Sequence, residues 1–114
     1  MAPAGFTPLD EFNYHPRLTA TDGLAVVMFS SPTCGTCRQV ERLLPTASPP
    51  AIKLFHVDVQ RNLGLARAFD LFHLPALFLY RNGHYHARLN TDVTPTGLRQ
   101  AIDRALAAPA EEEP

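Results

Sequence analysis

Short apolar runs alternate along the chain with segments of helical spacing, and this alternation predicts an α/β fold. The run from Leu24 to Phe29 is continuous and contains β-branched residues, which is typical of a strand buried on both faces in the middle of a sheet. The alternating pattern from Ile52 to Val59 predicts a second strand. The spacing from Asn62 to Leu71 predicts a helix whose inner face carries Leu65, Ala66 and Phe69.

A helix is also predicted directly after the first strand, from Cys34 to Leu44. Its apolar residues follow Cys37 at intervals of three and four. We expect Pro45 to end this helix, because proline has no N–H group and its ring clashes with the preceding turn.

The last third of the chain predicts a hairpin, a helix and a tail. Two β-rich runs are joined through Asn82-Gly83, a pair that tolerates the positive φ angles of a type I′ turn. The segment from Thr94 to Ala107 begins with an N-cap residue followed by proline, and its apolar residues form one stripe, so it predicts the closing helix. Residues 109–114, "PAEEEP", are acidic and bounded by prolines, and we expect a disordered acidic tail there.

Length and composition fit one domain, which we place at residues 1–108 of the 114. The ten basic and eleven acidic residues nearly cancel, which argues against a nucleic-acid partner and against binding to a membrane surface. The longest apolar run, "LAVVMF", is far shorter than the roughly 20 residues of a membrane helix. The first residues lack the basic and apolar regions of an export signal. We therefore expect a cytoplasmic monomer.

Both cysteines lie in one stretch, "SSPTCGTCRQV", separated by two residues. In a reducing compartment such a pair is typical of catalysis or metal binding rather than of a permanent disulfide. A cysteine at the start of a helix faces unpaired N–H groups that favour its thiolate form, so Cys34 is the predicted nucleophile. Cys37, three residues later on the same helical face, is the predicted resolving thiol. Two inert buried thiols are the alternative that these residues alone leave open.

Three segments together resemble the thioredoxin family: "CGTC" after an apolar strand, "FHVDV" before a helix, and "HLPALFLYRNG" with its proline, strand and turn. The resemblance covers roughly Leu24 to Ala107. It implies a thioredoxin-like fold, with a central mixed sheet flanked by helices and ending in an antiparallel hairpin and a C-terminal helix. It also implies thiol–disulfide exchange with protein disulfide substrates and electrons from a reductase or another thiol donor. We expect no cofactor.

The resemblance further implies roles for the residues around the cysteine pair. Pro75 would be cis and pack against the disulfide, and the backbone of Leu74 would pair with a substrate peptide. Gly35 and Thr36 add no bulk that would block a partner disulfide, although the family usually has proline in place of Thr36. The family has tryptophan where this chain has Thr33.

His73, two residues before the proline, either favours the thiolate of Cys34 as an imidazolium or is a solvated loop residue. His84 and His86 alternate on a predicted strand, and we expect them to form a polar stripe that faces solvent rather than a metal pair.

Other differences from the family pattern keep two further functions open. Met28 and Leu54 stand where the family has a buried aspartate and a lysine, which makes general reductase activity less certain than the fold. One alternative is a metal or iron–sulfur module in which Cys34 and Cys37 supply two ligands and His73 or a second subunit supplies the rest. The other is a redox-silent binding module that keeps the fold as a scaffold.

Overall fold

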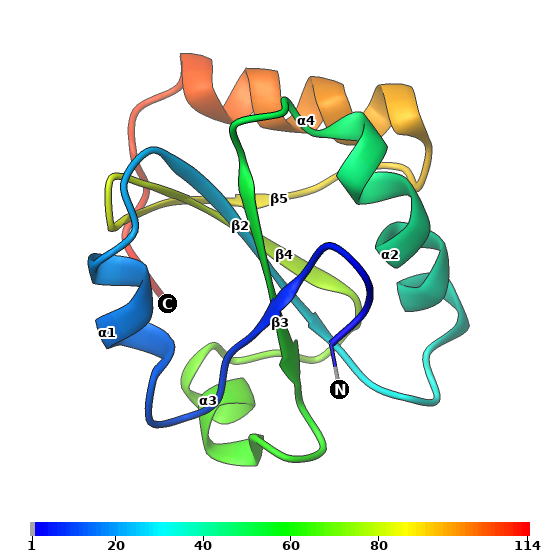
Figure 1. Cartoon of the computed structure of the whole chain (residues 1–114), viewed down its shortest axis with the longest axis vertical. Helices are drawn as coiled ribbons and strands as arrows, with labels where there is room; N and C mark the ends of the chain where they lie inside the picture. Colours follow the sequence, from blue (N-terminus) through cyan, green and yellow to red (C-terminus); the bar gives the residue numbers. More distant parts are fainter. Residues whose placement is uncertain (1) are drawn as a thin grey trace.

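A computed structural model describes residues 2–114 and has a five-stranded mixed sheet at its centre (Figure 1). The strands lie in the order β1-β3-β2-β4-β5, where β1 pairs with β3 and β3 with β2 in parallel, and β4 and β5 are antiparallel. Their bounds are Thr7–Pro8, Leu24–Ser30, Lys53–Asp58, Ala76–Arg81 and His84–Leu89 for β1 to β5. The central position of the apolar strand β2 and the late hairpin are confirmed.

Four helices in the described residues cover the two faces of the sheet (Figure 1). Their bounds are Tyr14–Thr19 for α1, Gly35–Ala47 for α2, Leu63–Ala68 for α3 and Pro95–Ala107 for α4. Helices α2 and α4 pack together over one face, and α1 and α3 cover the other. Within residues 2–114, no helix combines the length and the apolarity that crossing a membrane requires.

The side chains of each strand divide between two separate hydrophobic clusters, as the pleat of a strand dictates. The cluster under α2 and α4 is almost entirely aliphatic and includes Val26 and Met28 of β2 with Leu77 and Leu79 of β4. The cluster under α1 and α3 takes the alternate positions and is rich in aromatic rings, among them Tyr14, Phe29, Phe69, Phe78 and Tyr80. The cysteine-bearing helix therefore lies on the aliphatic face.

Helix α2 is longer than predicted, because Pro45 lies inside it rather than at its end. Proline removes only the hydrogen bond that its own N–H would make to the preceding turn. The helix continues because Leu44 and Ala47, on either side of the proline, are both buried against the sheet, and the N–H of Ser48 still bonds to the carbonyl of Leu44 at 2.9 Å.

Helix α3 is shorter than predicted, and α4 is as predicted. The chain leaves α3 after Ala68, and Asp70 has a φ of 55°, a left-handed conformation that no helix continues through. Phe69 is nevertheless buried, so the predicted inner face is retained. In α4 the Thr94 side chain accepts a hydrogen bond from the N–H of Gly97 at 2.9 Å and caps the helix.

The two histidines of β5 do not form the expected solvent-facing stripe. Tyr85 pairs with Tyr80, but Ala87 pairs with Leu79, so the register shifts at His86. This irregularity turns the His86 side chain inward, where its Nε2 lies 2.6 Å from the carbonyl oxygen of Ala105 in α4. His84 alone is exposed.

Residues 109–114 carry no helix or strand, but they make contacts along β5, where we expected a disordered tail. The backbone N–H of Glu111 donates to the carbonyl of His86 at 2.7 Å. The carboxylate of Glu113 accepts a hydrogen bond from the Tyr80 hydroxyl at 3.2 Å and lies 2.6 Å from His15 Nε2. The segment thus runs back from α4 toward α1 (Figure 1).

Candidate active site

Both cysteines lie where β2 leads into α2, and they form a disulfide with Cα atoms 5.3 Å apart. Cys34 is the N-cap residue of α2, and its sulfur accepts a hydrogen bond from the backbone N–H of Cys37 at 3.1 Å. The N–H groups of a first helical turn have no partner within the helix, so they favour negative charge on an atom that faces them. After reduction, the same position favours a thiolate on Cys34.

The two cysteines differ in burial. Cys34 is half-buried, whereas Cys37 is fully buried beneath the first turn of α2. A protein disulfide arriving from solvent therefore has access to Cys34 first. This difference suits the predicted order, in which Cys34 attacks and Cys37 resolves, and the order itself stays a prediction.

The peptide bond between Leu74 and Pro75 is cis, as the resemblance implied. Ala76 pairs with Phe29 across β2 and β4, so Pro75 comes next to the end of β2, where the loop to the cysteines starts. Pro75 also lines a groove together with Val40 of α2. The Leu74–Pro75 segment thus reaches the cysteine end of the sheet, and its contact with a substrate peptide stays a prediction.

The other predicted site residues are exposed to solvent near the cysteine end of the sheet. Gly35 and Thr36 are the first two residues of α2 and are exposed, and a Cβ atom on Gly35 would meet nothing within 4 Å. Thr33 is exposed, and its hydroxyl lies 3.2 Å from that of Ser31. His73 is exposed in the bend before Pro75, and within the described part of the chain it has no hydrogen bond or ion pair. Its position fits a solvated loop residue.

The sheet beneath α2 is apolar where the family has charged residues. Met28 is fully buried on the α2 face of β2, in the same cluster as Val40, which lies one turn after Cys37. Leu54 of β3 belongs to that cluster as well. Neither side chain can accept a proton from a thiol.

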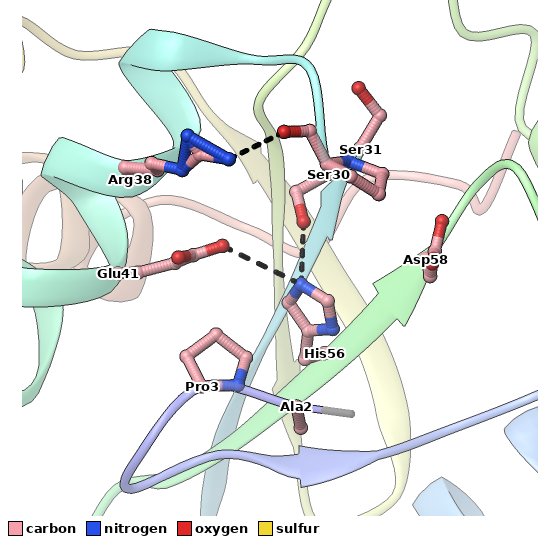
Figure 2. Close-up of a pocket in the computed structure, with 9 residues that line it drawn as sticks. Ala2, Pro3, Ser30, Ser31, Arg38, Glu41, His56 and Asp58 are labelled. Carbon is pink, nitrogen blue, oxygen red and sulfur yellow. Dashed lines mark hydrogen bonds and ion pairs between the residues drawn. The ribbon is translucent and has the colours of Figure 1, made fainter.

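A polar pocket lies beside the cysteine loop, and sequence reasoning missed it. Figure 2 shows its lining, with Arg38 and Glu41 on α2, His56 and Asp58 on β3, and Ser30 at the end of β2. The pocket measures about 260 Å³ and also touches Ser31 and Pro32 of the loop. The signal for Glu41 was available, because it follows Cys37 by four residues and thus lies on the same side of a helix.

Burial changes the proton affinity of two groups in this pocket. His56 is only 7% exposed, and burial lowers its pKa, so the imidazole is neutral near pH 7. Its Nε2 hydrogen-bonds to the Ser30 hydroxyl and lies 3.8 Å from a carboxylate oxygen of Glu41. Desolvation raises the pKa of Glu41, and the nearby Arg38 guanidinium partly opposes this. The pocket therefore holds a carboxylate with increased affinity for protons.

No group of three or more His, Cys, Asp or Glu side chains in residues 2–114 is arranged to hold a metal ion. In particular, the two cysteines and His73 form no such group there.

Comparison with known proteins agrees with this architecture. Two crystal forms of human ERp44, form I and form II, superpose with a TM-score of 0.73 at 21% identity over 91% of this chain. This chain spans 30% of each ERp44 chain, so that likeness concerns the fold alone. Thioredoxin-1 of Saccharomyces cerevisiae is 28% identical over 85 residues, which cover 73% of this chain and 82% of the yeast protein. The family model for thioredoxin matches residues 6–104, and the chain therefore belongs to the thioredoxin family.

Proposed function

We propose that this protein exchanges the Cys34–Cys37 pair with disulfides of other proteins, with Cys34 as the nucleophile and Cys37 as the resolving thiol. Membership of the thioredoxin family with a C-x-x-C pair supports thiol–disulfide oxidoreductase activity in general. The observation that carries the finer proposal is the contrast between a half-buried N-cap Cys34 and a fully buried Cys37.

The reaction proceeds in two exchanges. The thiolate of Cys34 attacks one sulfur of the substrate disulfide, and the other substrate sulfur leaves as a thiolate. Cys37 then loses its proton and attacks the sulfur of Cys34, which forms the Cys34–Cys37 disulfide and releases the second substrate thiolate. The substrate gains two electrons, and this protein loses them. A reductase or another thiol donor then returns the pair to the dithiol.

The substrate would approach along the groove beside Pro75. This groove is lined by the apolar residues Val40, Leu77 and Leu89 and by the polar residues Arg88, Asn90 and Thr91. In our proposal the backbone of Leu74 pairs with the substrate peptide here, and Thr33, Gly35, Thr36 and His73 line the approach. We further propose that the protein works in the cytoplasm, because a reducing compartment keeps such a cysteine pair available for exchange, and that it works as a monomer.

The test combines a thiol count with turnover. The reduced protein should show two free thiols and, after mild oxidation, none, while remaining monomeric on a sizing column. It should also accelerate the reduction of insulin by dithiothreitol above the rate with dithiothreitol alone. Two thiols that persist after oxidation, together with no effect on insulin, would exclude the proposal. A stoichiometric metal content in the same sample would favour the metal module instead.

A further inference from the structure

The second exchange requires a base, because Cys37 must lose its proton before it can attack. Cys37 is fully buried, so bulk water has poor access to it. Directly beneath α2, Met28 and Leu54 offer no proton acceptor. The acceptor must therefore lie on another side of Cys37.

Glu41 is the acidic residue of α2. It follows Cys37 by four residues on α2, so the two side chains are neighbours on one face of the helix. Side chains of a helix lean toward its N-terminus, which brings the Glu41 carboxylate over the turn that contains Cys37. The Glu41 side chain is 22% exposed, so it is partly withdrawn from solvent but keeps a path to it.

The Glu41 carboxylate faces His56, which is held in its own place. Figure 2 shows Glu41 and His56 pointing toward one another across the pocket. The Glu41 oxygen lies 3.8 Å from His56 Nε2. His56 is itself fixed by its hydrogen bond to the Ser30 hydroxyl and by edge-on contact with the Phe6 ring. The Arg38 guanidinium donates to the carbonyl of Pro32 at 2.6 Å.

We propose that Glu41 accepts the proton of Cys37 in the resolving step and that His56 is the residue that positions it. This inference rests on the proposed function. The S–H bond of Cys37 breaks as its proton moves to the Glu41 carboxylate, and the Cys37 thiolate forms the bond to the Cys34 sulfur. The bond between Cys34 and the substrate sulfur breaks at the same time. Glu41 then returns the proton to water or to the departing thiolate.

The charges around the carboxylate suit this role. The ionisable groups that face it are Arg38 on its own helix and His56 and Asp58 on β3. Burial raises the pKa of the Glu41 carboxyl, which makes its carboxylate a stronger base than an exposed one. Because His56 is neutral, it adds no positive charge that would lower the pKa of Glu41. The Arg38 guanidinium lowers that pKa only in part.

The test separates the two exchanges in time. Reduced protein mixed with an equimolar aromatic disulfide, dithiobis(nitrobenzoate), releases two coloured thiolates in succession. The first release reports attack by Cys34, and the second reports attack by Cys37. In Glu41→Gln we expect the second release at pH 7 to be slower by about 10-fold or more, as for loss of a general base. The difference should vanish above about pH 9, where a thiol ionises in water without help.

Two further variants serve as a charge control and as a test of the role of His56. Asp103→Asn removes the same charge from an exposed position of α4, where Asp103 lies 3.7 Å from Arg99, and should leave both releases unchanged. His56→Gln should slow the second release by less than Glu41→Gln does and should shift its pH profile. A second release in Glu41→Gln that is as fast as in the wild type at pH 7, or faster, would overturn the proposal. Absence of the first release from the wild type would instead refute the proposed function.

Discussion

The two faces of the sheet differ in what they contain. The face under α1 and α3 is rich in aromatic rings, whose centroids lie 5.0 Å apart for Phe69 and Phe78 and 5.8 Å apart for Tyr14 and Phe29. The face under α2 and α4 is aliphatic, and it carries the cysteine pair and the pocket of Glu41 and His56 at its edge. The titratable groups with perturbed pKa on the aromatic face are tyrosines, whose pKa burial raises further above neutral pH.

The residues that mainly stabilise the fold and the residues proposed for the chemistry thus lie on opposite faces of one sheet. Large rings bury more apolar area per residue than aliphatic side chains do, so the aromatic face contributes much of the free energy of folding. The aliphatic face, by contrast, leaves room at its edge for groups that exchange protons and electrons. Substitutions on the two faces should therefore have different consequences.

The largest expected effect is on the aromatic face. Phe78 is fully buried between Phe29 and Phe69, at ring-centroid distances of 5.5 and 5.0 Å. Phe78→Ala should lower the free energy of unfolding by about 3–5 kcal/mol, as measured by denaturant titration. The equilibrium of the cysteine pair with glutathione should stay unchanged. If Phe78→Ala fails to fold, Phe78→Leu supplies the same test with a smaller loss, and a several-fold change in that equilibrium would contradict the separation of the faces.

A second prediction places a charge on the aliphatic face. Met28→Asp should lower the free energy of unfolding by about 3 kcal/mol, because a carboxylate replaces a fully buried thioether. Burial raises the pKa of such a carboxyl in the folded state, so the loss should be smallest below about pH 4, where the carboxyl is protonated in both states, and should grow as pH rises. The variant should also reduce insulin faster near neutral pH, because the new carboxylate lies on the α2 face and can accept the proton of Cys37.

Met28→Asn is the matched control for this prediction, since it buries a polar group of the same size that is not a base. It should share much of the stability loss without the faster reduction. Equal insulin rates for Met28→Asp and the wild type across roughly pH 6 to 9 would show that proton transfer does not limit the reaction or that Met28 is too far from Cys37.

The smallest expected effect concerns the hydroxyl groups of the aromatic face. The Tyr14 and Tyr80 hydroxyls are 2.8 Å apart, and both residues are buried. Tyr80→Phe should lower the free energy of unfolding by about 1–2 kcal/mol, because the Tyr14 hydroxyl is left without its partner. The double variant with Tyr14→Phe should lose less than the sum of the two single losses. Additive losses in this denaturation series would mean that the two hydroxyls do not stabilise one another.

The sequence predicted the elements whose signals are local. The apolar run of β2, the Asn82-Gly83 turn and the Thr94 cap each depend on a few adjacent residues, and each is present. The pattern predicted no element before Leu24, because α1 has only six residues, of which Tyr14 and Leu18 are buried. Such a short helix is stabilised by tertiary packing rather than by its own periodicity.

The site could be predicted in part for the same reason. Cys34 and Cys37 are close in sequence, and the cis bond at Pro75 followed from the family resemblance. The pair of Glu41 and His56 was missed because its two residues are fifteen positions apart and meet only when α2 packs across β3. His86 was placed in solvent because a register shift in β5 has no clear signal in the sequence.

The most direct test of the account is to trap the mixed disulfide between this protein and a substrate. Reduced Cys37→Ser and Cys34→Ser variants would each be mixed with a protein disulfide such as insulin, and the covalent adducts would be counted by mass spectrometry. Because Cys34 caps α2 and is half-buried, whereas Cys37 is fully buried, Cys37→Ser should accumulate adducts through Cys34 and Cys34→Ser should not. Equal trapping by the two variants, or trapping by Cys34→Ser alone, would contradict the assignment of the nucleophile.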